Sequence, residues 1–245
     1  MLLPMIFATP ELLPDRRWWQ ALLCSCAMLA VAPASAQVCA NAPQQREASA
    51  QQIQDFVRSQ GKRVLTFVGY SGAEYQDPAA MRAAADHVLS LHDPARTLVN
   101  IGGTAVGIGA VYELAKRRGF GTMGIVSTLA RDGGEALSPC VDWVFFVRDD
   151  SWGGLLPGTT QLSPTSAAIV ANSHEIIAIG GGEIARDELR GARQAGKLLS
   201  YFAADMNHRI AIDKAAAKGQ SAPTDFRSAV DADFARKPRP SPWPA

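Results

Sequence analysis

The sequence predicts a doubly wound α/β fold, because short apolar segments alternate with segments of helical periodicity along most of its 245 residues. Nearly every residue of each short segment is apolar, which is typical of parallel strands covered by helices on both faces. Three of these segments end in glycines, at the edge where such sheets bind ligands. We therefore expect a mostly parallel, Rossmann-like sheet of about six strands with helices on both faces.

The regular alternation begins at residue 63. The β-branched, apolar run RVLTFVGYSG predicts a first strand over 63–72, and later strands are expected at 97–103, 122–127, 141–149, 175–182 and 199–205. Asp77 and Pro78 supply a cap and a first-turn proline for a helix over 77–92. Further helices are expected at 107–119, 163–173, 183–196 and 206–219.

Residues 1–36 have the pattern of a secretory signal peptide. Arg16 and Arg17 precede an apolar stretch, and Ala34-Ser35-Ala36 places small residues at both recognition positions before Gln37. Cleavage after Ala36 predicts a periplasmic or secreted protein with no membrane contact. An uncleaved N-terminal anchor is the alternative, although the apolar run is short for a membrane span.

The chain after residue 36 divides into three parts. Ile53, Phe56 and Val57 lie at helical spacing in residues 37–61, which predicts an amphipathic helix packed on the domain. Residues 62–219 are expected to form the Rossmann-like domain, of nucleotide-binding type. Residues 220–245 are rich in proline and lack periodicity, which predicts a flexible tail; their aromatic residues leave open a docking segment.

Charge and residue spacing exclude several functions. The formal net charge is +1 and there is no long basic run, so the sequence lacks the electrostatic pattern of a nucleic-acid-binding protein. The four histidines are scattered and no CxxC or HExxH motif occurs, so neither a metal site nor a cofactor is expected. Cys39 and Cys140 remain after signal removal, and they could form one disulfide or stay as two free thiols.

Glycine-rich turns follow three of the expected strands. They are Gly69-Tyr70-Ser71-Gly72, Gly102-Gly103-Thr104 and Gly180-Gly181-Gly182. The carboxyl ends of parallel strands share one edge of the sheet, so we expect these turns to form one ligand site. Tight turns without a ligand are the alternative.

The second glycine turn suits a phosphate. It leads through Gly107 and Gly109 into a helix, so that backbone N–H groups and the Thr104 hydroxyl can meet an anion. It is not a Walker A loop, because no Gly-Lys-Ser/Thr follows. Tyr112 stands where a dinucleotide fingerprint needs its third glycine, and the next strand ends without an acid for the ribose. These departures argue against a hydride-transfer dehydrogenase.

The helix after the third glycine turn begins with several acids. Glu183, Asp187 and Glu188 lie close to its start, with Arg186 between them. Acids in a first turn interact favourably with the helix dipole, each by about 0.3–1 kcal/mol, which explains two of the three without any chemistry. Glu188, Glu183 and Arg186 nevertheless remain candidates for catalytic groups.

The order of these motifs resembles that in the Lonely Guy phosphoribohydrolases, long mislabelled lysine decarboxylases, and in the superfamily they share with the DNA-processing protein A fold. The resemblance covers residues 62–210. Its matches are the Gly-Ser turn at Gly69, Ser71 and Gly72, the second glycine element at Gly102, Gly103, Gly109, Ala110 and Val111, and the P-G-G-x-G-T-x-x-E motif at Gly181, Gly182 and Glu188. It implies a nucleotide-type ligand and a catalytic role for Glu188.

Departures from that family concern its chemistry. Gly180 replaces the proline of the motif and Ile184-Ala185 replace its Gly-Thr. The arginine–lysine pair of the family falls near Thr165 and Ser166, in a stretch without basic residues, so Arg186 is the candidate replacement cation.

The sequence therefore predicts an exported protein that binds a nucleotide-like or phosphorylated small molecule, with weak or lost catalysis. Two alternatives stay open: an active nucleoside 5′-monophosphate phosphoribohydrolase, which cleaves the N-glycosidic bond, and a structural interaction domain without a ligand. A homodimer is also left open.

Overall fold

A single parallel sheet of seven strands organises the protein. The structure, a computed structural model, describes Cys39 and residues 42–234. The strand order is β1-β5-β4-β3-β2-β6-β7 and every neighbouring pair is parallel. The strands are β1 (Gln44–Glu47), β2 (Arg63–Gly69), β3 (Thr97–Ile101), β4 (Gly121–Ser127), β5 (Trp143–Val147), β6 (Glu175–Ile179) and β7 (Leu198–Phe202). The predicted doubly wound α/β fold is confirmed, with one strand more than expected.

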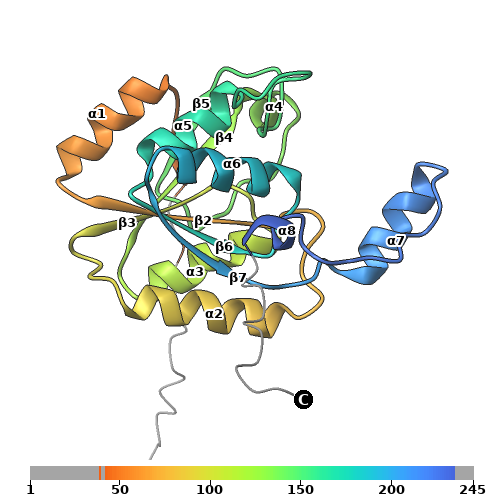
Figure 1. Cartoon of the computed structure of the whole chain (residues 1–245). Coiled ribbons are helices and arrows are strands. Elements are labelled where there is room, and N and C mark those ends of the chain that lie inside the picture. The colour runs from red at the N-terminus through yellow and green to blue at the C-terminus, as the bar shows by residue number, and fades with distance from the viewer. Residues whose placement is uncertain (1–38, 40–41, 235–245) are drawn as a thin grey trace, which may run out of the picture. The chain divides into compact units, whose positions relative to one another are not determined.

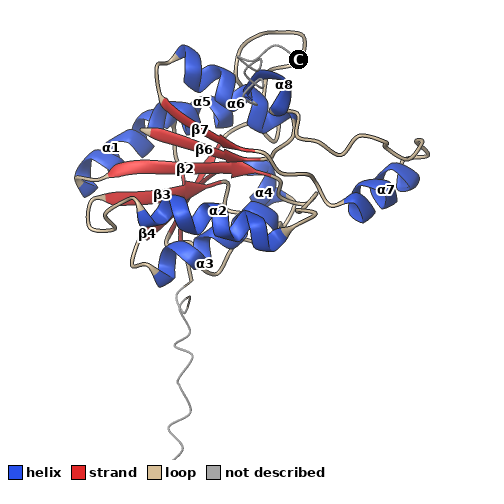
Figure 2. Ribbon diagram, turned by 60° about the horizontal axis from the view of Figure 1, so that its bottom comes forward, coloured by secondary structure: helices blue, strands red, loops and turns tan. Residues whose placement is uncertain are grey.

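Helices cover both faces of the sheet (Figures 1 and 2). They are α1 (Ala50–Gln60), α2 (Pro78–Ser90), the 3₁₀ turn η1 (Gly107–Gly109), α3 (Ala110–Arg117), α4 (Thr128–Asp132), α5 (Pro164–Asn172), α6 (Glu183–Gln194), α7 (His208–Ala217) and α8 (Asp231–Phe234). Successive side chains of β2 enter different cores, as strand geometry requires. Leu65 packs in the core under α2 and α3, whereas Val64 packs with α1 and α5 and Val68 with α6.

The additional strand is β1, at the edge of the sheet. Its residues QQRE are polar and all exposed. They show neither the alternating nor the continuous apolar pattern by which a strand is recognised in a sequence. It forms through backbone pairing with β5, where Gln44 lies opposite Trp143. The expected amphipathic helix is α1, which Ser49 begins with a capping box to Gln52. The N-terminal part thus holds a strand as well as the predicted helix.

The chain reverses its winding direction between β2 and β6. It passes outward from β2 to β3 and β4 through α2 and α3, and then returns across the other face through α5 to β6, beside β2. Folds of this kind bind ligands beyond the strand ends at such a reversal. The Tyr75 hydroxyl fixes this point, because it accepts a hydrogen bond from Tyr70 N (3.1 Å) and donates one to Ile179 O (2.8 Å).

A disulfide ties the start of the described chain to the domain. Cys39 and Cys140 are bonded, with their Cα atoms 4.6 Å apart. Of the two alternatives that the sequence leaves open, the structure therefore has the paired form. Cys140 lies shortly before β5 and Cys39 shortly before β1, so the bond anchors the segment that leads into β1 next to its partner strand.

The chain after α7 returns to the domain before residue 234. Val230 is fully buried, and both Ala229 N and Ser228 Oγ donate hydrogen bonds to Gly181 O. Arg190 of α6 pairs with Asp233 of α8 at 2.6 Å. Residues 220–234 therefore include a docked stretch, where the composition predicts a flexible tail; residues 235–245 lie outside the described residues.

The predicted signal peptide, residues 1–36, also lies outside the described residues. Within Cys39 and residues 42–234, no helix combines the length and the apolar character that crossing a membrane requires.

Candidate functional site

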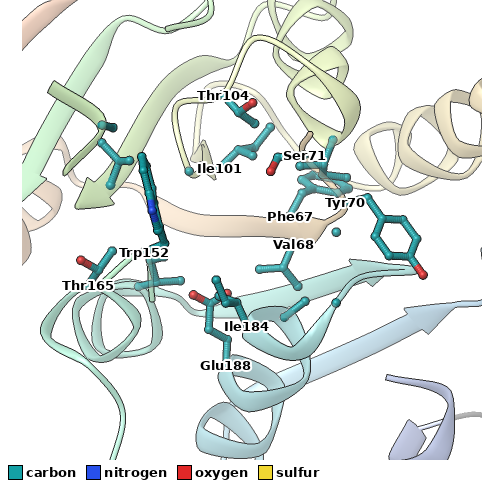
Figure 3. Close-up of a pocket in the computed structure, with 18 of the residues that line it drawn as sticks. Phe67, Val68, Tyr70, Ser71, Ile101, Thr104, Trp152, Thr165, Ile184 and Glu188 are labelled. Atoms are coloured by element: carbon teal, nitrogen blue, oxygen red, sulfur yellow. The ribbon is translucent and has the colours of Figure 1, made fainter. Parts of the chain in front are cut away.

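A cavity of about 890 Å³ opens at the carboxyl ends of β2, β3 and β6, where the winding reverses (Figure 3). The turns after these strands contribute Gly69, Ser71, Gly102, Thr104 and Gly182 to its lining. The first two turns of α6 contribute Glu183, Ile184, Ala185 and Glu188. The three glycine turns thus meet at one cavity, as their placement after parallel strands predicts.

Most of the glycines serve close packing of the backbone. A Cβ at Gly69 would clash with the Tyr75 hydroxyl, one at Gly107 with Tyr70 O, and one at Gly109 with Thr104 O. Gly103 and Gly181 have positive φ angles of 75° and 120°, which favour glycine. Gly103, Gly107, Gly109 and Gly181 do not line the cavity. These positions therefore need glycine whether or not a ligand binds.

Gly102 and Gly182 have a different environment. A Cβ at Gly102 would meet only Ile125 O, at 4.0 Å, and one at Gly182 would meet nothing within 4 Å. Both line the cavity, so their missing side chains leave space for a ligand. Gly72 does not line it; its carbonyl accepts a hydrogen bond from Lys214 Nζ at 2.8 Å.

The N-terminus of α6 faces the cavity without a side-chain cap. Gly182 is its N-cap, and the first intrahelical bond within the helix runs from Arg186 N to Gly182 O. The N–H groups of Glu183, Ile184 and Ala185 therefore have no partner inside the helix. By contrast, α1, α2, α5 and α7 are each capped by a serine, aspartate or asparagine side chain. The open N–H groups and the helix dipole of α6 favour an anion in the cavity.

Glu188 is buried in the wall of the cavity and is only 4% exposed. Its Oε1 accepts a hydrogen bond of 2.7 Å from Ser166 Oγ on α5. Burial, together with the nearby Asp187 carboxylate, raises the pKa of Glu188 to about 7 although the Ser166 hydrogen bond lowers it. Glu188 can therefore exchange a proton near neutral pH, as a general acid or base must.

The other polar residues at the start of α6 pair with one another. Arg186 lies 3.0 Å from Asp187 and 3.6 Å from Glu183, and Arg190 lies 4.0 Å from Asp187. The Arg186 side chain does not line the cavity, whereas the exposed Glu183 does. The expected replacement cation thus contacts two acids other than Glu188. Thr165 and Ser166, near which the family resemblance places an arginine–lysine pair, are neutral.

Several lining residues carry no motif that could have marked them. Lys214 reaches the cavity from α7, Lys218 from the residue directly after α7, and Trp152 from the loop after β5. Asn100 of β3 and Thr165 of α5 are buried and also line the cavity. Neither element contains a charged residue that would mark it as part of a site. The loop that carries Trp152 and the alanine-rich helix α7 contain no sequence motif that indicates a ligand. Only the fold brings them to the carboxyl ends of the strands.

No group of three or more potential metal ligands occurs in the part of the chain that the structure describes. The charged side chains in the lining of the cavity are those of Lys214, Lys218, Glu135, Glu183 and the buried Glu188.

Neither a protein-family model nor a curated protein matches the chain. Among solved structures, a structural genomics target named TM1055 is similar, with 21% identity, a TM-score of 0.42 and coverage of 56% of this chain and 72% of that one. The Moco carrier protein of Chlamydomonas reinhardtii is similar at 18% identity and a TM-score of 0.41, covering 58% and 76% of the two chains. Ligand and chemistry are therefore inferred from the geometry of the site itself.

We expect Glu188 to make stability depend on pH. Its pKa is about 7 in the folded protein and 4.5 in the reference state, so the folded state binds the proton more tightly. The stability that this proton contributes is fully present below about pH 4.5 and is lost as the pH rises through 7, by about 3 kcal/mol in total. Glu188→Gln keeps the acceptor for Ser166 and removes the titration.

Urea unfolding of both proteins between about pH 4.5 and pH 8 measures this effect. The free energy of unfolding of the wild type should fall relative to that of Glu188→Gln over this range. The comparison removes other titrations, including that of His174, whose pKa is lowered chiefly by burial. Parallel curves for the two proteins would show that Glu188 titrates normally.

Proposed function

We propose that the protein is exported and binds a nucleotide or a related phosphorylated small molecule in this cavity, with weak or lost catalysis. The observation that carries the proposal is the uncapped N-terminus of α6, which opens onto the cavity where the winding of the sheet reverses. It agrees with the ligand that the resemblance to the Lonely Guy superfamily implies.

A phosphate at α6 would meet three free N–H groups and the positive end of the helix dipole. Gly182 leaves room for it, since no atom lies within 4 Å of the position of a Cβ there. Lys214 and Lys218 add positive charge to the lining. Among the acids near the start of α6, Asp187 is paired with Arg186 and Arg190, and Glu183 lies 3.6 Å from Arg186. The raised pKa of Glu188 favours its neutral form.

The size of the cavity also fits a nucleotide. Small-molecule sites have volumes of roughly 300–1,000 Å³ and combine apolar walls with a few polar groups. This cavity, at about 890 Å³, has Val68, Ile125, Ile169 and Ile184 in its walls beside the polar residues already described.

Loss of catalysis follows from the surroundings of Glu188. A phosphoribohydrolase of the resembled family holds its substrate with an arginine while its glutamate acts at the ribose carbon. Here neither Thr165 nor Ser166, near which the arginine–lysine pair of that family would fall, is basic, and Arg186 pairs with Asp187 and Glu183. Charge that develops in the transition state would lack a nearby cation, and such preorganised partners supply much of the rate enhancement of an enzyme.

Ligand binding is tested by the melting temperature in the presence of nucleoside 5′-monophosphates. A ligand at 100 times its Kd should stabilise the protein by about 2.7 kcal/mol. Gly182→Asp should abolish this shift, because it places a negative charge where the phosphate would bind. Gly182→Asn has the same shape without the charge, so it is the matched control and should retain more of the shift.

Both substitutions should fold, since φ at Gly182 is −86° and either side chain can cap α6. If nucleotides raise the melting temperatures of wild type and Gly182→Asp equally, the phosphate binds at another position. No shift of the wild type with any nucleotide would favour the interaction domain without a ligand.

Catalysis is tested by the release of ribose 5-phosphate from adenosine monophosphate. We expect little turnover by the wild type and by Glu188→Gln. In an active enzyme, this substitution would remove general acid–base help worth about 10²–10⁴-fold in rate. Robust wild-type turnover that collapses in the variant would instead establish the phosphoribohydrolase alternative, which the raised pKa of Glu188 keeps open.

Export is supported by the signal-peptide pattern together with the Cys39–Cys140 disulfide, because disulfides persist mainly in oxidising compartments. We expect the mature chain, expressed in a bacterial host, to begin at Gln37. Intact-mass spectrometry of the purified chain checks this, and a mass that includes residues 1–36 would refute cleavage.

A further inference from the structure

The loop after β5 carries Trp152 to the rim of the cavity, and its backbone is fixed before that residue by a buried carboxylate. Asp149 is 4% exposed. Its Oδ2 accepts a hydrogen bond from Thr165 N at 2.8 Å, and its Oδ1 accepts bonds from Ser151 N and Ser151 Oγ at 2.9 and 2.8 Å. The residue that precedes Trp152 is therefore held to α5.

The same loop is fixed again directly after Trp152. Gly154 N donates to Ser166 Oγ at 2.8 Å, and Gly154 O accepts from Ser163 N at 2.8 Å. Gly153 has a φ of 125°, and a Cβ there would lie 2.9 Å from Ser166 Oγ and 3.8 Å from Glu188 Oε1. The loop thus passes directly beside the buried carboxyl group, where no side chain would fit.

Between these two anchors, Trp152 stays 53% exposed while its side chain lines the cavity. Figure 3 shows its ring standing at the edge of the cavity, on the side where Thr165 and Glu188 lie. A half-exposed indole lacks part of the burial that normally stabilises a large aromatic side chain. A fixed backbone and an exposed ring are what a stacking surface requires.

Two buried polar atoms in the lining of the same cavity lack partners among the described residues. Thr165 is 2% and Asn100 is 0% exposed, and both line the cavity. Thr165 Oγ1 and Asn100 Oδ1 make no hydrogen bond with any described residue. A buried polar group without a partner is costly, so these two atoms are suited to bind the polar edge of a ligand.

We propose that Trp152 stacks on a planar aromatic ring of the ligand, with Thr165 and Asn100 available to the edge of that ring. The inference rests on the proposed function and makes it more specific. The ligand is a ring-bearing phosphorylated compound of the nucleotide class rather than a sugar phosphate, and its phosphate lies toward α6.

The test compares nucleoside 5′-monophosphates with ribose 5-phosphate, which has the same phosphate and sugar but no ring. Calorimetric titration of wild type, Trp152→Ala and Trp152→Phe gives the affinities. Trp152→Ala should weaken nucleotide binding by about 5- to 100-fold, the usual effect of losing one stacking side chain, and should leave ribose 5-phosphate binding unchanged. Trp152→Phe should retain most of the nucleotide affinity.

Each other outcome has a separate meaning. Equal nucleotide affinity in wild type and Trp152→Ala would overturn the stacking role while the proposed function stands. An equal loss for nucleotide and ribose 5-phosphate would show that Trp152 only shapes the loop. If neither compound binds the wild type, the proposed function fails and the inference with it. The melting temperatures of both variants report whether they fold.

Discussion

The buried hydroxyl of Tyr75 holds together the two strands between which the site opens. It accepts a hydrogen bond from Tyr70 N, at the end of β2, and donates one to Ile179 O, at the end of β6. Burial raises the pKa of Tyr75 well above its usual value, so the hydroxyl remains a donor. Without it, two buried backbone groups would lose their partner, at a cost of about 1–3 kcal/mol each. Gly69 has to be glycine because this hydroxyl fills the position of its Cβ.

A second tyrosine performs a similar task between β3 and β4. The hydroxyl of Tyr112 accepts from Gly103 N at 3.1 Å and lies 2.8 Å from both Ile101 O and Met123 O, so it joins the end of β3 to the middle of β4. Tyr112 stands at the position where a dinucleotide-binding turn has its third glycine. Near the turn after β3, the side chain of Tyr112 therefore fills space that a third glycine leaves open in a dinucleotide-binding turn. The sequence departs from the dinucleotide-binding motif at this position for that reason.

Ser166 links the loop that carries Trp152 to the buried carboxyl group in the wall of the cavity. Ser166 accepts a hydrogen bond from Gly154 N and donates one to Glu188, so the same hydroxyl fixes the tryptophan loop and orients the buried carboxyl group. A basic side chain at position 166 could not make both contacts, because an ammonium or guanidinium group only donates. The hydroxyl of Ser166 can therefore hold the loop and the carboxyl group together, which a basic side chain at this position could not do.

By itself, the sequence determined the fold, because apolar runs, helix caps and glycines act through local geometry. It also determined that the three glycine turns meet, because parallel strands end at one edge of the sheet. The tertiary structure decided the rest. It formed β1 from four polar residues, through backbone pairing with β5 and through the contacts of Arg46 with the Phe56 and Phe145 rings, and it joined Cys39 to Cys140. It also separated the glycines that packing requires from Gly102 and Gly182, which face the cavity. Trp152 and Lys214 reach the site from a loop and a helix without motifs, since the distance between segments far apart in the chain depends on how the whole chain packs.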